Sequence, residues 1–274
     1  MGYAVYSNSK PTVNSFKSFF EMLWNSRLLA EKLQEADRLQ REFIHIAAHE
    51  LRTPIQPILG MAELIESALQ EKTGASSIKP EEIKMIARNA RRLQRLSEDI
   101  LDIARIESSS LTLHKSLFNL KDVLMLLVED CRKQIQMDGR EVKIIHKQLD
   151  DLEVYADKDR IMQVLGNLLS NALKFTKQGT ITVHSEQSND KSQLIVKVTD
   201  TGLGIDPALL LRLFTKFATK SDKGTGLGLY ISKSIVETHG GKIWAENNHD
   251  GKGSTLTFTL PVQKPYQEQQ LSSS

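Results

Sequence analysis

The chain has 274 residues, enough for two domains of ordinary size with a short tail. Apolar residues make up 40% and charged residues 26%, which is typical of a soluble globular protein, and the net charge is only +2. This balance gives no electrostatic basis for binding nucleic acid, which requires clustered basic residues. The single cysteine, Cys131, excludes an intrachain disulfide and a Cys-rich metal site and fits a reducing compartment.

The first 26 residues are expected to be the remnant of an N-terminal sensor domain or a linker. Tyr3, Val5 and Pro11 are typical of a strand end followed by a turn, and a frayed terminus is the alternative. The longest apolar run, residues 16–24, falls short of the roughly 20 residues that a membrane span needs, and the signal-peptide and myristoylation patterns are absent. We therefore expect a cytoplasmic chain, with the upstream sensor domain and any membrane anchor outside it.

Residues 27–108 show the spacing of two long helices. The first is predicted over residues 27–69 and the second from Pro80 to Glu107, with residues 71–79 as the loop between them. Each helix carries a heptad seam of mostly apolar or small side chains. The seam of the first helix is Leu29, Leu33, Ala36, Gln40, Ile44, Ala48, Leu51, Ile55, Ile58, Ala62 and Ile65, and that of the second is Ile83, Ile86, Ala90, Leu93, Ser97, Ile100 and Ala104.

A lone pair of such helices would leave much of both seams in water. Two antiparallel hairpins packed as a four-helix bundle would bury them, so residues 27–108 are predicted to be a dimerisation domain and the protein a homodimer. The alternative is an intramolecular hairpin covered by the rest of the chain, which the long entry helix disfavours.

Residues 108–110 are predicted to be a hinge, and residues 109–118 a linker. After the hinge the pattern changes to mixed strands and helices. Residues 119–262 are expected to form an α/β sandwich, with helices on one face of a mixed sheet, and residues 263–274 a disordered tail. Strands are predicted at residues 111–117, 142–147, 180–186, 193–199, 242–246 and 254–260, and helices at 120–136, 157–175, 207–214 and 226–239.

His49 begins the stretch His-Glu-Leu-Arg-Thr-Pro and lies one residue off the seam position Ala48, so it is expected to face solvent. A neutral imidazole, whose ordinary pKa is about 6.5, offers a lone pair to a phosphorus centre. Glu50 can accept or orient the other ring proton, as a general base does. Because Pro54 and Pro57 lack an N–H, the helix is expected to bend just beyond His49.

Metal binding is a second interpretation of the same helix, because His45 and His49 lie four residues apart on one face. The zinc-protease pattern requires a second histidine three residues after Glu50, where Thr53 stands, and no cysteine or carboxylate cluster supplies a third ligand. The simplest alternative for His49 is an ordinary surface histidine.

A second group of polar residues follows further along the chain. Asn167, Asn171 and Lys174 share one face of a predicted helix, where amide oxygens can bind Mg²⁺ and an ammonium can meet phosphate. Asp200 follows a predicted strand and can accept a hydrogen bond from an amino group such as that of adenine.

Glycines accompany this second group. Gly202 and Gly204 follow Asp200, and Gly224, Gly226 and Gly228 open a predicted helix, whose first N–H groups attract anions. Each piece alone is weak, because a glycine pair is more often a plain turn and a polar helix face is more often solvated surface. Together, and in this order after the His49 stretch, these motifs predict a nucleotide-binding site.

These motifs closely resemble those of the histidine kinase family over roughly residues 40–261. The resemblance implies a dimerisation and phosphoacceptor domain followed by a Bergerat-type (GHKL) ATP-binding domain, the fold of gyrase and Hsp90. It implies ATP and Mg²⁺ as cofactors, phosphate transfer to an aspartate of a response regulator, and phosphatase activity on that regulator. Residues 49–54 resemble the H box, 167–176 the N box, 200–205 and 224–229 the two glycine boxes, and 213–217 the F box.

Position by position, the resemblance implies that His49 is the phosphoacceptor, Glu50 its acidic helper and Thr53 the residue linked to phosphatase activity. It implies that Asn171 is the Mg²⁺ ligand and that Asp200 binds adenine. The other implied nucleotide contacts and lid residues are Asn167, Lys174, Phe175, Gly202, Gly204, Phe214, Phe217, Lys220, Gly224, Thr225, Gly226, Leu227 and Gly228.

The sequence departs from the family pattern after the F box. The segment between Phe217 and Gly224 is short, and Ala218 and Thr219 stand where many members carry an aromatic residue and an arginine. The missing positive charge would have to come from a nearby lysine, and the candidates are Lys216 and Lys220.

Three other functions fit parts of the pattern. A transmitter dominated by phosphatase activity fits the Glu-x-x-Thr spacing of Glu50 and Thr53. A dimeric ATP-binding scaffold without catalysis is disfavoured by the intact His49, Asn171 and Asp200. ATPases like gyrase and Hsp90 share the ATP motifs and lack the His-Glu-Leu-Arg-Thr-Pro helix.

Overall fold

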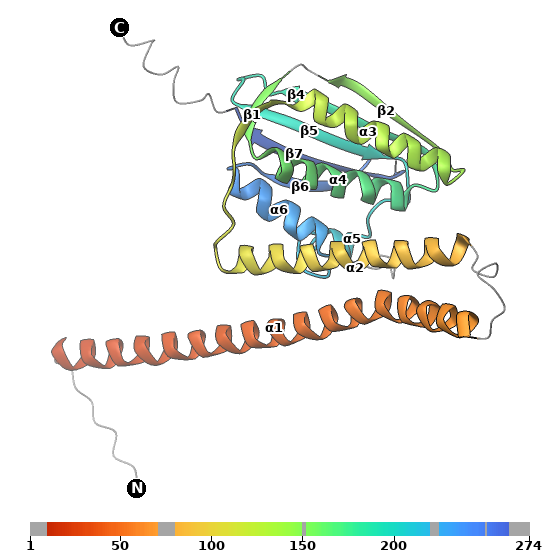
Figure 1. The fold of residues 1–274 in the computed structure, drawn as a ribbon. Helices are drawn as coiled ribbons and strands as arrows, with labels where there is room; N and C mark the ends of the chain where they lie inside the picture. Colours follow the sequence, from red (N-terminus) through yellow and green to blue (C-terminus); the bar gives the residue numbers. More distant parts are fainter. Residues whose placement is uncertain (1–9, 71–79, 150–151, 220–224, 250, 263–274) are drawn as a thin grey trace. The chain divides into compact units, whose positions relative to one another are not determined.

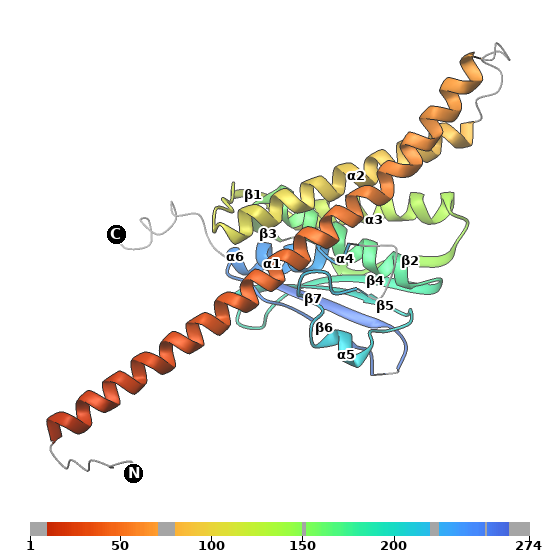
Figure 2. The same cartoon turned by 90° about the horizontal axis from the view of Figure 1, so that it is seen from below.

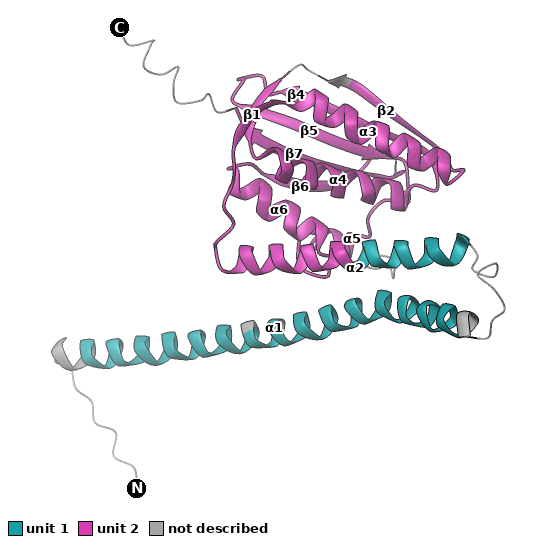
Figure 3. Ribbon diagram, viewed as in Figure 1, with its two compact units in different colours: residues 1–93 teal, residues 94–274 magenta. Residues whose placement is uncertain are grey.

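The computed structural model describes residues 10–70, 80–149, 152–219, 225–249 and 251–262 (Figures 1 and 2). The chain divides into two compact units, Met1–Leu93 and Gln94–Ser274, which are coloured separately in Figure 3. The boundary falls inside the second helix, so each unit contains part of it.

The first unit is built from the long helix α1 (Lys10–Gln70) and the N-terminal part of α2 (Pro80–Glu107). The turn expected at Pro11 is wrong, because Pro11 lies in the first turn of α1, where its missing N–H leaves no helical hydrogen bond unmade. The strand end expected at Tyr3 and Val5, and the loop expected at residues 71–79, lie outside the described residues.

Pro54 and Pro57 lie inside α1 without ending it. Figure 1 shows one continuous helix whose axis changes direction in its C-terminal part, which agrees with the backbone hydrogen bonds that the two prolines remove. Thr53 Oγ1 donates to the carbonyl oxygen of His49 at 3.0 Å, one turn back along the helix.

The predicted seams are largely open in the single chain. Ile44 on α1 and Ile83 on α2 have exposed fractions of 58% and 57%, and the other described seam residues are exposed or half-buried. The buried side chains lie at other positions, at Ala47 and Pro54 of α1 and at Leu96, Asp102 and Ile103 of α2. The seams therefore leave apolar surface that a further helix would cover.

The second unit contains a mixed sheet, as the sequence predicted, and the sheet has five strands. Strands β2 (Glu141–Leu149) and β4 (Gln178–Gln187) are parallel, and every other neighbouring pair is antiparallel. Figure 2 shows the helices α3 (Leu120–Met137), α4 (Lys158–Phe175) and α6 (Gly228–Thr238) on one face of this sheet. The strand order is β2 (Glu141–Leu149), β4 (Gln178–Gln187), β5 (Gln193–Asp200), β7 (Ser254–Pro261), β6 (Ile243–Asn247).

Local sequence explains where these helices begin and which face they bury. The side chain of Asn119 accepts from Lys121 N at the start of α3, and that of Asp157 accepts from Arg160 N at the start of α4. Both helices pack an apolar stripe against the sheet. The fully or nearly buried core residues on the two helices are Leu120, Val123, Leu124, Val128, Cys131, Ile135, Ile161, Val164, Leu165, Leu168, Leu169, Ala172 and Leu173.

Two predicted elements of this unit need correction, and one short strand was not predicted. The strand expected over residues 111–117 is confined to β1 (Ser116–Asn119), which pairs with a strand that the sequence did not predict, β3 (Glu153–Ala156). The helix expected over residues 207–214 is the single turn α5 (Pro207–Leu210), started by the Asp206 cap. Each of these segments is too short for its hydrophobic period to be distinctive. The tail at residues 263–274 lies outside the described residues.

Candidate active site

His49 and its neighbours on α1 and α2 form the part of the site in the first unit. The His49 side chain is 69% exposed, and its Nδ1 lies 3.6 Å from Oε1 of Glu50, which is itself only 19% exposed. The other oxygen of Glu50 accepts from Nη2 of Arg92 on α2 at 3.0 Å. Arg92 was not predicted as a site residue, because nothing in the spacing of α2 indicates a contact 42 residues back along the chain.

The remaining predicted residues belong to the second unit, where α4 carries the first of them. Asn167 Nδ2 donates to the carbonyl oxygen of Gly228 at 3.1 Å and to Ser232 Oγ at 3.2 Å, so Asn167 holds the first turn of α6. Asn171 is half-buried, and its side chain hydrogen-bonds to no residue within the described part of the chain. Lys174 Nζ lies 5.0 Å from the centroid of the Phe175 ring.

Asp200, at the end of β5, is only 3% exposed, and both carboxylate oxygens are held. Oδ1 accepts from Gly202 N at 2.8 Å and Oδ2 accepts from Ser254 Oγ at 2.6 Å. Its backbone oxygen accepts from Asn248 Nδ2 at 2.8 Å. These contacts fix the carboxylate in one orientation, as an acceptor for a ligand amino group requires. Ser254 and Asn248 were not predicted as site residues, because Asp200, which both contact, lies about 50 residues earlier in the chain.

Glycines permit the close approaches around this carboxylate. A Cβ on Gly202 would lie 2.5 Å from the backbone oxygen of Phe175 and 2.9 Å from Asp200 Oδ1, so no larger residue fits there. Gly204 has φ +72°, a left-handed conformation that favours glycine. The next residue, Ile205, is held through both its N–H and its carbonyl by the amide of Asn247, each at 2.7 Å.

The second glycine box lies against the F box. Gly226 has φ +68°, and a Cβ on it would lie 2.7 Å from the carbonyl carbon of Phe217. Thr225 Oγ1 accepts from the N–H of Leu227, which is fully buried and precedes α6 without a side-chain cap. Among the described residues no side chain caps the start of α6, and a helix start of this kind attracts anions. Lys220 and Gly224 lie outside the described residues.

The positive charge near the F box is engaged with two helices. Lys216 Nζ forms an ion pair with Glu107 at the end of α2 and lies 5.4 Å from the ring centroid of Tyr230 in the first turn of α6. Phe214, the other F-box aromatic, is half-buried. Of the two lysines that the sequence offered, Lys216 is therefore placed next to the glycine-box helix.

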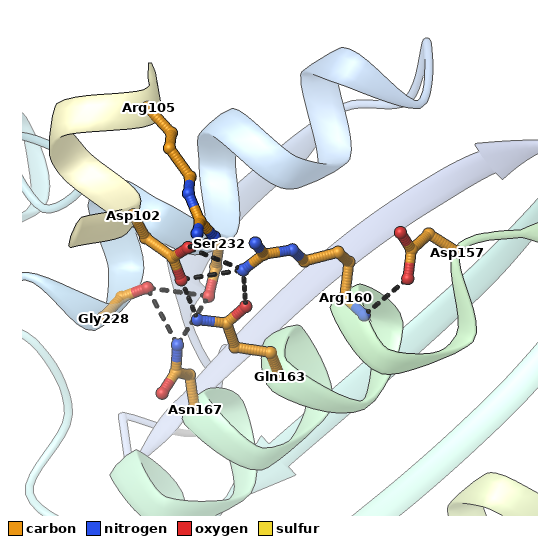
Figure 4. A network of polar contacts seen from close by, with 8 residues as sticks. All are labelled: Asp102, Arg105, Asp157, Arg160, Gln163, Asn167, Gly228 and Ser232. Carbon is orange, nitrogen blue, oxygen red and sulfur yellow. Dashed lines mark hydrogen bonds and ion pairs between the residues drawn. The ribbon is translucent and has the colours of Figure 1, made fainter. Parts of the chain in front are cut away.

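A polar network ties α2 to the same helix that carries the two asparagines (Figure 4). Arg160 Nη1 donates to both oxygens of Asp102 at 2.8 Å, and Gln163 Nε2 donates to one of them at 2.7 Å. Asp102 is only 5% exposed, and burial together with the charge of Asp102 raises the pKa of the neighbouring Asp99 to about 6. This network was not predicted, since Asp102 lies outside the seam of α2.

The ATP motifs lie on α4, at the end of β5, in the F box and at the start of α6, all within one unit. His49, Glu50 and Thr53 belong to the other unit. A buried, oriented carboxylate beside a glycine turn can bind an amino-substituted base, and an uncapped helix start can bind phosphates.

Comparison with known proteins identifies the class. Residues 39–109 match the His Kinase A (phospho-acceptor) domain, and residues 156–264 match the histidine kinase-, DNA gyrase B- and HSP90-like ATPase family. The sensor histidine kinase WalK of Bacillus subtilis is 33% identical over 247 residues, which cover 86% of this chain and 38% of WalK. The autoinducer 2 sensor kinase/phosphatase LuxQ of Vibrio parahaemolyticus is 32% identical over 248 residues, covering 86% of this chain and 28% of LuxQ.

Solved structures of histidine kinases are also similar to this chain. The histidine kinase AdeS of Acinetobacter baumannii has a TM-score of 0.63 and 26% identity, over 79% of this chain and 98% of that one. The histidine kinase ThkA, in complex with the response regulator protein TrrA, has a TM-score of 0.59 and 30% identity, over 81% of this chain and 61% of that one.

The two matched domains together span well over half of the chain, which belongs to the histidine kinase family as the transmitter region of a sensor histidine kinase. The family and fold class predicted from the sequence are thereby confirmed, and the ATPase domain implies ATP binding. The chain spans 38% and 28% of the lengths of WalK and LuxQ. No helix in the described ranges is long and apolar enough to cross a membrane.

Proposed function

We propose that this chain is an autophosphorylating protein-histidine kinase that transfers the γ-phosphate of Mg·ATP to His49 and passes it to an aspartate of a response regulator. The observation that carries the proposal is an exposed imidazole beside an anchored carboxylate, in the same chain as a buried, oriented carboxylate in an ATPase domain. The His Kinase A match supports His49, and ThkA, a relative solved with a response regulator, supports the partner.

Different residues of the ATPase domain bind different parts of the nucleotide. Asp200 accepts a hydrogen bond from the amino group of adenine, and Gly202 leaves room for the base. The N–H groups at the start of α6, beginning with Gly228, meet the phosphates, and Lys174 supplies positive charge. Asn171 fits Mg²⁺, because its half-buried amide oxygen is uncommitted among the described residues and Mg²⁺ prefers oxygen ligands. The ion, when bound, neutralises charge that develops on the phosphates.

At His49 the Nε2 lone pair attacks the γ-phosphorus, the bond to the ADP oxygen breaks, and a phosphorus–nitrogen bond forms. The imidazole gains positive charge in this step, and Glu50 stabilises it by accepting the Nδ1 proton. The present separation of 3.6 Å is longer than a hydrogen bond, so this contact tightens as the charge develops. Arg92 keeps Glu50 on the correct side of the ring.

A homodimer follows from the open seams of α1 and α2. Covering one Leu or Ile side chain is worth about 1.5–3 kcal/mol, so several such residues outweigh an association cost of roughly 4–15 kcal/mol. Residues such as Ile44 and Ile83, more than half exposed in the single chain, are the surface that a second copy covers. The His Kinase A match supports the same assembly.

Dephosphorylation of the regulator is a second activity of the same helix. Thr53 lies one turn beyond His49, and its hydroxyl donates to the His49 carbonyl, from which it can turn to orient a water molecule. The name of LuxQ as a sensor kinase/phosphatase supports this pairing of activities in a relative.

The decisive experiment is incubation of the pure chain with γ-labelled ATP and Mg²⁺. We expect a label that is labile in acid and stable in base, and its loss in the His49→Gln variant with little change in ATP affinity. An acid-stable label would indicate a hydroxyl acceptor, and a label that persists in His49→Gln would move the acceptor, with His45 the first residue to test. ATP binding without any label would favour a non-catalytic scaffold.

A further inference from the structure

The C-terminal part of helix α2, which belongs to the second unit, presents two carboxylates to the nucleotide-binding part of that unit. Asp102 is buried and bound by Arg160 and Gln163 of α4 (Figure 4). Arg160, Gln163, Asn167 and Asn171 fall 0, 3, 7 and 11 positions along α4 and therefore share one face of that helix. Arg160 and Gln163, which bind Asp102 of α2, therefore lie at the N-terminal end of the same polar face that carries the proposed ATP residues.

The second carboxylate, Glu107, lies five residues later on α2 and is paired with Lys216 of the F box. Lys216 has a defined position beside the glycine-box helix, because its Nζ lies 5.4 Å from the ring centroid of Tyr230 in the first turn of α6. The next residue, Phe217, lies close to Gly226, because a Cβ on that glycine would be 2.7 Å from the carbonyl carbon of Phe217. The ammonium that Glu107 holds is therefore adjacent to the segment that would bind the phosphates.

The two contacts differ in strength. The side chain of Asp102 is 7% exposed and its charge is fully hydrogen-bonded, so losing a partner while it stays buried is costly. The side chains of Glu107 and Lys216 are 50% and 28% exposed, so water and salt weaken their attraction and it breaks readily. Asp102 is suited to anchor α2, and Glu107 is suited to release its partner.

We propose that Glu107 is a positioning residue that withholds Lys216 from the phosphates of ATP, so that α2 and the nucleotide compete for one ammonium group. The inference rests on the proposed function, because it needs the phosphates at the start of α6. A triphosphate carries more negative charge than one carboxylate and displaces Glu107 when it binds. Bound ATP then loosens this end of α2 from its unit while Asp102 still holds.

The test measures the dissociation constant of a non-hydrolysable ATP analogue with Mg²⁺ by calorimetry on the 274-residue chain. Glu107→Gln is expected to tighten binding about two- to fivefold, the range set by an exposed ion pair. Adenosine, which has no phosphate, should bind Glu107→Gln and the unaltered chain equally. The matched control is Glu81→Gln, which removes an exposed carboxylate at the start of the same helix.

A double substitution decides whether Glu107 affects nucleotide affinity through Lys216. In a Lys216→Met background, the added Glu107→Gln change should leave the affinity for the analogue unchanged. Glu107→Asp, which keeps the charge and shortens the reach, should tighten binding of the analogue in the same direction as Glu107→Gln. Either result supports the proposal without relying on a single variant.

Three results would overturn the proposal: unchanged affinity for the analogue in Glu107→Gln, an equal gain for adenosine, or the same gain when Lys216 is already replaced. A general loosening of the ATPase domain would give the second result. Failure of the unaltered chain to bind the analogue at all would instead contradict the proposed function, so the two failures are distinguishable.

Discussion

The guanidinium of Arg92 donates to Glu50 at 3.0 Å across the helical hairpin, on the side of the carboxylate away from His49. Arg92→Met should leave Glu50 free to rotate away from the imidazole and slow phosphorylation of His49 by about tenfold, which is less than the 10²–10⁴-fold of a lost general base. Single-turnover labelling at saturating ATP measures this rate. Arg88→Met, an exposed arginine on the same helix, is the control. Equal rates in both variants would remove Arg92 from the site.

Asp200→Asn should weaken ATP binding by about tenfold or more, because a hydrogen bond to a charged group contributes roughly 1.5–3 kcal/mol. Binding of inorganic triphosphate should change far less, since Asp200 is assigned to the base. Ser254→Ala should have a smaller effect in the same direction, because Ser254 only orients the carboxylate. Calorimetry with both ligands tests this, and equal losses for ATP and triphosphate would contradict the assignment.

Mixing two inactive chains tests the dimer and the direction of transfer. His49→Gln lacks the acceptor and Asn171→Asp lacks the proposed Mg²⁺ ligand, so each alone should give no label. After co-refolding, label appears if phosphate passes between the two chains, and none appears if it stays within one chain. Light scattering at the monomer mass across micromolar concentrations would contradict the dimer itself.

Thr53→Ala should reduce dephosphorylation of the partner regulator several-fold and spare autophosphorylation, because the kinase step does not use its hydroxyl. The hydrogen bond from Thr53 to the His49 carbonyl is lost as well, so the helix content of the variant must be checked by circular dichroism. Thr53→Ser keeps the hydroxyl and should retain the activity. An unchanged phosphatase rate in Thr53→Ala would refute this role.

His239 predicts a pH dependence of folding stability. Its Nε2 accepts from Asp157 N at 3.1 Å and its Nδ1 is paired with the Ile235 carbonyl, and burial lowers the pKa of His239 below its ordinary 6.5. Below pH 6.5 the unfolded chain therefore binds a proton that the folded chain resists. The stabilisation is full above pH 6.5 and is lost as the pH falls towards the folded pKa.

Thermal unfolding between pH 5 and pH 7.5 measures this effect. On acidification the melting temperature of the unaltered chain should decrease relative to that of His239→Gln, whose side chain cannot be protonated. The comparison with the variant is needed because Asp99, with its pKa raised to about 6, acts in the opposite direction over the same range. Parallel curves for the two chains would remove His239 as the cause.

Local sequence predicted the parts of the site that depend on one segment. The 3.6-residue period placed Asn167, Asn171 and Lys174 on one face of α4, and alternation placed Asp200 at the end of β5. It did not predict Ser254 or Arg92, because their contacts join segments that are distant in the sequence.

Short elements set the other limit. Strand β3 has four residues and is fixed by pairing with β1, a long-range hydrogen-bonding pattern that four residues cannot encode. In the segment before β1, Leu111 and Leu113 continue the alternation of a strand, yet no neighbouring strand pairs with them among the described residues. Periodicity reports which face of a segment is apolar, and strand pairing requires a partner as well.

The single cysteine gives this chain a practical property. Cys131 is buried on α3, and burial raises its pKa to about 11, so at neutral pH it is a protonated thiol with little access to reagents. A maleimide dye or spin label added at neutral pH will therefore react selectively with a cysteine introduced at an exposed position. Pairs of such labels, one on each compact unit, would measure the distance between the two units in the otherwise unaltered sequence.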